Sequence, residues 1–191
     1  SQALMAITTG ATSTAVGRNA LKAATTGSSN VAIGYAVLDA LTTADLNTAV
    51  GYFAGSGVTD GHTNTFIGSE AGKAITTGDE NTAVGHGALD AGTTVNGNTA
   101  VGTDTMASAS YAGSYNTAVG YNALLVSTTG SGLTAVGNQA LDANTTASNN
   151  TAVGSGALGA VTTGGTNTAV GWGAGDAITT GSQNVIVGYN C

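Results

Sequence analysis

The chain has 191 residues, of which 31 are glycine, none is proline and only 7% are charged, and its formal net charge is −7. Three basic residues are too few for a nucleic-acid groove, which needs dense positive charge, and no apolar run approaches the ~20 residues that cross a membrane as a helix. A monomer of this length with so few charges would be poorly soluble, so the composition fits a chain whose flanks are covered by partner chains.

A short phrase ending in glycine recurs through the whole chain. It reads NTAVG at Asn47 and again at Asn116, and its glycine returns every 17 residues, with a single step of 18 before Gly120. Eleven copies at a fixed period indicate a solenoid, in which each coil packs only on its neighbours. The glycines are Gly17, Gly34, Gly51, Gly68, Gly85, Gly102, Gly120, Gly137, Gly154, Gly171 and Gly188.

Each coil is predicted to contain two short strands and two turns. Thr-Ala-Val alternates as a strand does, with Thr and Val on one face and Ala on the other. We expect Val and the Leu that follows the glycine to form the core, and Ala to face outward. Asn before the strand and Thr-Thr-Gly after it supply turns, because Asn and Gly tolerate positive φ. Coils spaced by ~4.8 Å give a rod roughly 50 Å long.

Two columns of equivalent residues predict how the coils hold together. The Asn that begins each phrase is expected to form an amide ladder from coil to coil. Where three coils have Gly in place of Leu, a larger residue follows three positions later, which indicates an exchange of volume inside one thin core. These pairs are Gly55 with Val58, Gly72 with Ile75, and Gly175 with Ile178.

The domain organisation is a single repeat region over residues 1–191 with one irregular coil. Neither end carries a capping segment, so we expect a piece of a longer fibre. Thr103–Gly120 contains the one-residue insertion, and SYAGSY at Ser110–Tyr115 replaces Thr-Thr-Gly. A loop with a local role and simple drift of the repeat are both open interpretations. Cys191 falls in a column of small residues, where burial is favoured over an interchain disulfide.

The repeated phrase resembles two kinds of fibrous protein. NTAVG, NVAIG (Asn30–Gly34) and NVIVG (Asn184–Gly188) are similar to the head repeat of trimeric autotransporter adhesins, the YadA-like head, and NTAVGYxAL followed by TTG resembles segments of phage tail fibres. The resemblance covers essentially the whole chain. It implies a left-handed parallel β-roll, three chains side by side as a homotrimer, and an extended attachment surface. The 17-residue period is longer than that of the bacterial heads and favours the phage-fibre variety.

The expected function is therefore a structural and adhesive fibre module, extracellular in a virion tail fibre or on a bacterial cell surface. We expect no enzyme activity, no cofactor, no metal, no nucleic-acid partner and no membrane insertion. His62 and His86 lie in different columns, and Lys shares the column of Asp residues, which argues against a metal array.

A cell-surface glycan or receptor is the candidate external partner. Aromatic residues gather directly after the glycine, where rings at a turn edge can stack on sugars. The favoured alternative is that these rings cover the core edge or fill a seam between chains. The candidate contact residues are Tyr35, Tyr52, Tyr121, Trp172 and Tyr189, with Tyr111 and Tyr115 of the irregular coil.

The alternative function is ice binding by stacked Thr rows, which we rank below the fibre. Two adjacent Thr columns run along the chain, and only one of them can face outward because neighbours in a strand point to opposite sides. If the outer row is the second column, Asp60 and Tyr111 interrupt it. The first column contains Thr25, Thr42, Thr59, Thr76, Thr93, Thr128, Thr145, Thr162 and Thr179.

Overall fold

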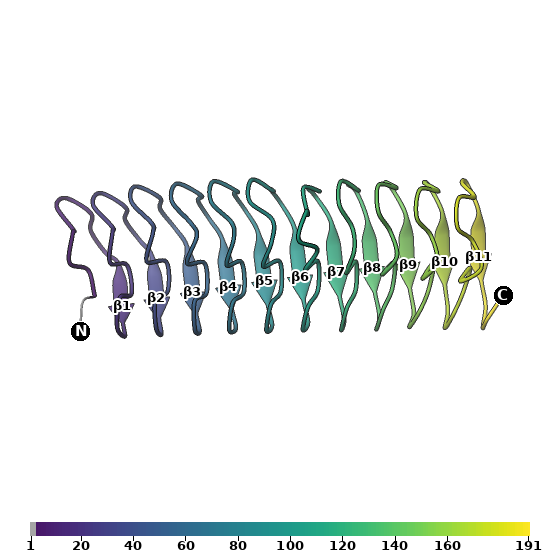
Figure 1. Cartoon of the computed structure of the whole chain (residues 1–191), viewed down its shortest axis with the longest axis horizontal. Helices are drawn as coiled ribbons and strands as arrows, with labels where there is room; N and C mark the ends of the chain where they lie inside the picture. Colours follow the sequence, from purple (N-terminus) through teal and green to yellow (C-terminus); the bar gives the residue numbers. More distant parts are fainter. Residues whose placement is uncertain (1–2) are drawn as a thin grey trace.

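The computed structural model describes residues 3–191, which form one parallel β-solenoid without a helix (Figure 1). Residues 1–2 of the predicted repeat region lie outside the described part. Each coil contributes one three-residue strand, and the eleven strands pair in chain order as a single sheet along the stack. The predicted all-β solenoid is confirmed. The strands are β1 (Thr14–Val16), β2 (Val31–Ile33), β3 (Thr48–Val50), β4 (Thr65–Ile67), β5 (Thr82–Val84), β6 (Thr99–Val101), β7 (Thr117–Val119), β8 (Thr134–Val136), β9 (Thr151–Val153), β10 (Thr168–Val170) and β11 (Val185–Val187).

The prediction of two strands per coil is wrong, because the rest of each coil is a series of turns. Several of these turns need left-handed residues, including Asn122 (φ 56°) and Leu124 (φ 54°). In the regular coils, neither the Asn before the strand nor the glycine of Thr-Thr-Gly has a positive φ, although the sequence predicts one. The turns still bond coil to coil, since Leu124 N–H donates to Ala140 O at 3.1 Å. From this left-handed backbone the Leu124 side chain points into the core, where it is fully buried.

The glycine that ends each strand is required by its backbone. Gly120 has φ +139°, a region that side chains disfavour, and a Cβ there would overlap the carbonyl oxygen of Gly137 in the next coil. The same close approach recurs from coil to coil along the stack. The repeated glycine therefore marks a place where backbones of successive coils meet with no room for a side chain.

The two faces of the strand are the reverse of the prediction. Ala118 is 0% exposed, whereas its neighbour Val119 is 37% exposed. The core is thin, so Ala on the sheet leaves room for Leu from the opposite wall. The Ala residues predicted to face outward are in fact core residues, and so are the larger members of the same column. Ala49, Ala83, Ala118, Ala152 and Phe66 are fully buried, and Ile186 packs against the core.

The predicted Asn ladder is present, and its Asn members from Asn30 to Asn167 are buried. Asn64 donates from Nδ2 to Asn47 Oδ1 at 3.1 Å and to Gly78 O at 2.8 Å, and its own Oδ1 accepts from Asn81 Nδ2 at 3.1 Å. This amide is thereby bonded to the coils on either side, which removes the penalty for burying it. Leu133 interrupts the column.

The exchange of volume in the core is also present, and it has a second cause. Phe66 lies on the sheet between the coils that carry Gly55 and Gly72, and a Cβ at either glycine would come within 2.7 Å or less of the Phe66 ring. Gly175 meets Ile186 in the same way. A bulky residue in the Ala column is thus accommodated by removing Leu from the neighbouring coils.

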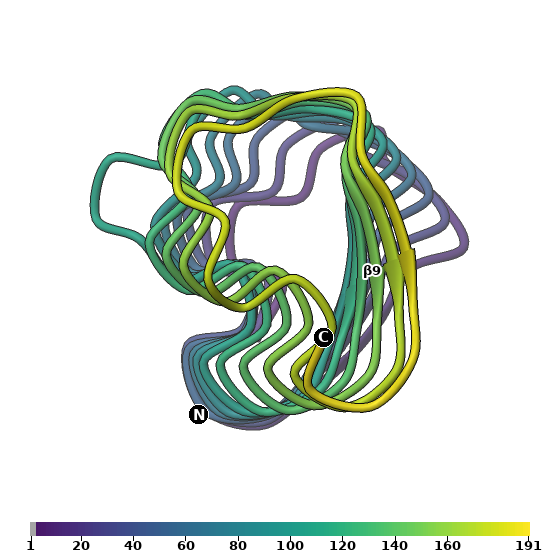
Figure 2. The same ribbon diagram turned by 90° about the vertical axis from the view of Figure 1, so that its right-hand side faces the viewer.

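The irregular coil keeps its place in the sheet. Thr99 pairs with Thr117 across the 18-residue step, as equivalent residues do elsewhere. The additional length lies away from the strand, around residues 107–110, and Figure 2 shows one teal loop standing out from the side of the stack. The insertion therefore forms a loop, and a local role for it stays a hypothesis.

Candidate functional surface

The outer face of the sheet is uncharged and carries a Thr column beside a column of Val and Ile. None of the strand residues in β1–β11 is charged. Thr fills the first outward position in nine strands, and Val or Ile fills the last outward position in all eleven. This β face, defined by those two outward columns, therefore runs along the whole stack.

Exposed large apolar side chains concentrate on this side of the molecule. Apart from Met5, Ile7 and Val126, all of them lie on the β face or in two columns beside it. We call the residues two positions before each strand the leading column, which includes Leu46 and Tyr115. The residues two positions after each strand are the trailing column, which contains the predicted aromatic residues. An apolar surface of this extent on one side is typical of a contact site.

The trailing column holds its aromatic rings at the surface, as predicted. Tyr35 and Tyr52 stack with ring centroids 5.5 Å apart and planes 18° apart, and Trp172 and Tyr189 stack at 4.9 Å and 17°. Phe53 contacts both Tyr35 and Tyr52 edge-on. Stacking between coils covers one face of each ring, so the free surfaces are the remaining faces and the ring edges. Tyr121, which has no such stack, is 52% exposed.

The two tyrosines of the irregular coil lie in opposite environments. Tyr111 is only 3% exposed, so it is not available to a glycan, and this part of the predicted contact set is wrong. Its hydroxyl donates to Asn98 Oδ1 at 3.1 Å and accepts from Asn116 Nδ2 at 2.6 Å. Burial raises the pKa of Tyr111 above its usual range. Tyr115 is exposed in the leading column, beside Gly97.

The two Thr columns divide as expected, with one half-buried and one exposed. In the first, Thr128 Oγ1 donates to Thr145 O of the next coil at 2.9 Å, so the hydroxyl is used within the chain. The second column is exposed, and Asp60 interrupts it, accepting from Thr43 Oγ1 at 2.6 Å. Tyr111 does not interrupt that row, because its side chain is in the core.

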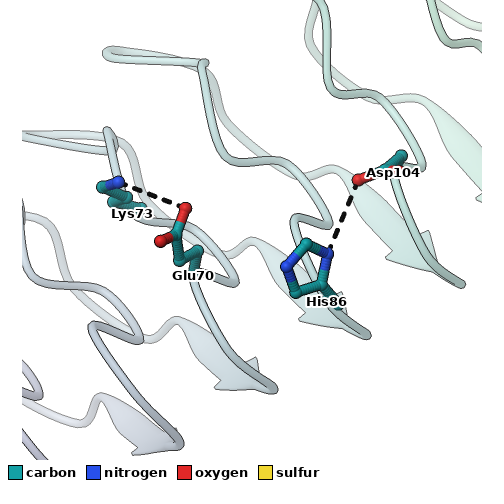
Figure 3. Close-up of polar contacts among 4 residues, drawn as sticks. All are labelled: Glu70, Lys73, His86 and Asp104. Atoms are coloured by element: carbon teal, nitrogen blue, oxygen red, sulfur yellow. Dashed lines mark hydrogen bonds and ion pairs between the residues drawn. The ribbon is translucent and has the colours of Figure 1, made fainter.

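No charged side chain lies in a strand, although Arg18, Glu80 and His86 stand in the columns beside the β face. Lys73 pairs with Glu70 at 3.2 Å, and His86 Nδ1 lies 3.7 Å from Asp104 Oδ1 (Figure 3). These side chains are substantially exposed, so the pairs contribute little to stability. They bring together no nucleophile and general base, and no catalytic arrangement is present among these four residues.

Other polar residues satisfy turn backbone groups. His62 N–H donates to Asp79 Oδ1 at 2.7 Å, and the His62 ring accepts from Asp45 N–H through Nδ1 at 3.0 Å. Ser114 and Ser131 occupy the same column and accept the equivalent bonds in later coils. His62 is therefore part of a structural column of acceptors.

Three aspartates occupy equivalent positions in their coils, each five residues after the repeated glycine. Burial is the main cause that raises the pKa of Asp39, Asp90 and Asp142. For Asp90, the nearby carboxylates of Asp104 and Glu70 raise the pKa further. These carboxylates therefore cost stability when they are ionised.

Within residues 3–191 the surface shows no pocket and no group of three or more metal-ligating side chains, and no helix could cross a membrane. Cys191, the last residue of the described chain, is exposed there, and its burial stays a prediction. The candidate sites are consequently the β face and its two flanking columns.

Comparison with known proteins gives no assignment. No protein-family model, no curated protein and no solved structure matches the chain. The likeness to the YadA-like head and to phage fibres therefore stays a prediction from the repeated phrase.

Sequence reasoning missed the β face and the leading column. The signal for the face is given by Phe66 and Ile186 in the Ala column, which lie next to coils with Gly in place of Leu. This pattern indicates that the Ala column points into the core, so that Thr and Val face outward. The signal for the leading column is Leu46 and Tyr115, two large side chains in a column that is otherwise small or polar.

Proposed function

We propose that the chain is a rigid module of an extracellular fibre, in a phage tail fibre or a bacterial surface adhesin. Copies pack side by side through the β face, as a homotrimer. The module serves as a shaft and as an attachment surface, and it catalyses no reaction. The observation that carries this proposal is an uncharged face of eleven strands on a continuous solenoid, with an exposed column of Val and Ile and exposed aromatic residues beside it.

The solenoid supports the role of a shaft. Coils are joined by in-register strand pairing from β1 to β11, by a buried Asn ladder and by hydrogen bonds between turns. Such a stack resists bending, and its length grows with the number of coils. A stiff rod holds a binding tip at a fixed distance from its anchor.

The size of the β face supports packing between copies. Ten strand spacings of ~4.8 Å give about 50 Å, and the strand with its flanking columns spans up to about 20 Å. The product is up to about 1,000 Å², which is comparable to the area that one partner contributes to a standard protein interface. With no strand charge to desolvate, this face is well suited to burial.

The packing is tested by sedimentation equilibrium of the wild type and of Val136→Lys at micromolar concentration. We expect a homotrimer for the wild type and a shift toward monomer for the variant, because the lysine would place a charge in the contact. Thr146→Lys is the matched control, since Thr146 is exposed away from the strands. A monomeric wild type would contradict the proposal.

Attachment is assigned to the exposed rings of the trailing column. Tyr52, Tyr121 and Trp172 keep part of their ring surface free, and a repeated edge can add weak contacts into multivalent binding. Screening on a glycan array, followed by Tyr121→Ala and Trp172→Ala, tests this role. Binding that survives both substitutions would exclude this column, and no binding at all would leave the shaft alone.

Ice binding remains the second candidate, because the second Thr column of the Thr-Thr-Gly turns is exposed along the stack. The two functions require different surfaces and predict different behaviour. A monomer that shows thermal hysteresis would favour ice, and a homotrimer without thermal hysteresis would favour the fibre.

A further inference from the structure

Arg18 is the first residue of the trailing column and lies against the first aromatic stack. Its guanidinium carbon Cζ is 5.8 Å from the centroid of the Tyr35 ring, which is the distance of a cation–π contact. Tyr52 of the next coil stacks on the Tyr35 ring with centroids 5.5 Å apart. Phe53 contacts both tyrosine rings edge-on, with its ring plane 82° from each of theirs. We call these four residues the Arg18 cluster.

The backbone holds the cluster at intervals of one coil. Ala36 N–H donates to Arg18 O at 2.9 Å, and Phe53 N–H donates to Tyr35 O at 3.0 Å. The strands that precede the members of the cluster, β1, β2 and β3, pair in register. The positions of these side chains are therefore set by the solenoid itself, which lowers the entropy cost of binding a ligand.

The guanidinium of Arg18 forms no ion pair within residues 3–191. Lys73, by contrast, pairs with Glu70 at 3.2 Å. Arg18 is exposed, and it is one of three basic residues in a chain that has ten acidic ones. An unpaired arginine among so many carboxylates keeps its N–H donors available to an anion from outside the chain.

The open ring surface of the cluster lies two coils from Arg18. Tyr35 is only 38% exposed, because Arg18 of the preceding coil and Tyr52 of the following coil both lie against it. Tyr52 is 52% exposed, and the next residue of the column, Ser69, is too small to cover its ring. The C–H face of a pyranose ring can stack on this tyrosine, which is held from the side by Phe53.

We propose that the Arg18 cluster binds an acidic glycan, with a sugar ring stacked on Tyr52 and a carboxylate of the same glycan paired with Arg18. The inference rests on the attachment role proposed above and names the class of glycan. Arg18 and Tyr52 are two coils apart, or about 10 Å. A single sugar is too short to reach both, so the ligand is an oligosaccharide that lies along the column.

The guanidinium distinguishes an acidic glycan from a neutral one. Its planar fork donates two parallel N–H bonds to the oxygens of a carboxylate, and these bonds are stronger than bonds to a sugar hydroxyl. Because Arg18 is exposed, dissolved salt screens this attraction, and the affinity for an acidic glycan should fall as the salt concentration rises.

The second aromatic stack provides a comparison within the same chain. Trp172 and Tyr189 stack at 4.9 Å, but no Lys or Arg follows Lys73 in the sequence. The charged residue nearest to Trp172 in the sequence is Asp176, an exposed carboxylate that would repel an anion. This stack is therefore suited to neutral sugars, and the preference for an acidic glycan belongs to the Arg18 cluster.

Calorimetric titration with oligogalacturonate and with its methyl ester tests the inference, because the two ligands share one sugar chain and differ in charge. We expect the wild type to bind the acid about tenfold or more tightly than the ester at low salt. Arg18→Gln should remove this difference. Arg18→Lys should retain part of it, because lysine keeps the charge without the fork. Tyr52→Ala should weaken the binding of both ligands.

Lys22→Gln is the matched control, since it removes one positive charge from the same coil. Lys22 is exposed, and its charge acts on the Asp39 carboxylate. The variant should keep the wild-type preference for the acid. A preference that survives Arg18→Gln would overturn the assignment of the site. An equal loss from Lys22→Gln would also overturn it, by showing that the net charge of this coil attracts the ligand.

The outcomes separate this inference from the attachment role. Equal affinity for the acid and the ester, or binding of neutral glycans alone that Trp172→Ala abolishes, would overturn the acidic class and leave attachment intact. No binding of any glycan would overturn both. Unchanged melting temperature and sedimentation of Arg18→Gln are expected, because the side chain is exposed, and they would assign its loss of preference to the site.

Discussion

Ala118 and Val119 are adjacent in β7 and face opposite sides of the sheet: Ala118 is completely buried, and Val119 is substantially exposed. The relationship recurs along the stack, so the chain has a core of Ala and Leu inside and a column of Val and Ile outside. It separates the residues that stabilise a single chain from those available for contact between chains.

Replacing these two neighbours by the same residue should give very different results. Ala118→Asp would bury an unpaired charge and is expected to cost several kcal/mol, about 3–5, of unfolding free energy. Val119→Asp should cost about 1 kcal/mol or less in a single chain, because the carboxylate reaches water. Urea unfolding of dilute protein measures both costs, and a larger loss for Val119→Asp would contradict this orientation.

Phe66 and Gly72 should be strongly coupled. Phe66→Ala is expected to cost about 3–5 kcal/mol by leaving a cavity. Gly72→Leu alone would collide with the Phe66 ring. The double variant restores the Ala and Leu composition of the common coil, so we expect it to be more stable than the sum of the single changes predicts. A double-mutant cycle with a coupling energy near zero would show that the two positions do not share volume.

The Asn ladder should be sensitive to interruption in its interior. Asn64→Leu removes the donor to Gly78 O and the acceptor for Asn81, so we expect a loss of about 2–4 kcal/mol. Leu133→Asn is the matched reverse change, because Leu133 already stands in this column. It should be tolerated with a smaller change in melting temperature. Equal loss from both variants would contradict a stabilising role for the ladder.

Much of the fold follows from the sequence because the repeat fixes it. The 17-residue period predicts the coil, and the column of Asn predicts the ladder seen at Asn64. The inward face of the strand could not be decided from Thr-Ala-Val alone, since Ala and Val are both apolar and a strand alternates symmetrically. Phe66 beside Gly55 and Gly72 contains the missing information, because a large residue needs space only if it points into the core.

The turns and the candidate sites were less predictable. A left-handed backbone at Leu124 opposes the usual preference of Leu, and it is maintained by burial of the side chain, which local sequence does not reveal. The insertion predicted a loop, but it could not show that Tyr111 points into the core while Tyr115 points outward. That difference depends on the space left at Gly92 in the preceding coil, where a Cβ would come within 3.3 Å of the Tyr111 ring.

The buried aspartates predict an unusual dependence of stability on pH. Burial raises the pKa of Asp142 above 3.8, so the folded chain binds its proton more tightly than the unfolded chain does. The contribution to stability is therefore fully present below pH 3.8 and is lost as the pH rises through the raised value. Asp142→Asn should raise the melting temperature at pH 7 and leave it nearly unchanged at pH 3.

The control for this prediction is Asp176→Asn, in the same column but exposed. We expect little change in its melting temperature at either pH. A lower melting temperature for Asp142→Asn at pH 7 would show that the ionised carboxylate stabilises the fold, contrary to the burial argument.

The central claim is that copies pack side by side through the β face. Its most direct test is small-angle X-ray scattering of the purified chain at micromolar concentration, from which the mass per unit length is obtained. Packing through the β face predicts three chains within a rod about 50 Å long, because the copies lie side by side. One chain per about 50 Å of length, whether as a monomer or as an end-to-end filament, would contradict the account.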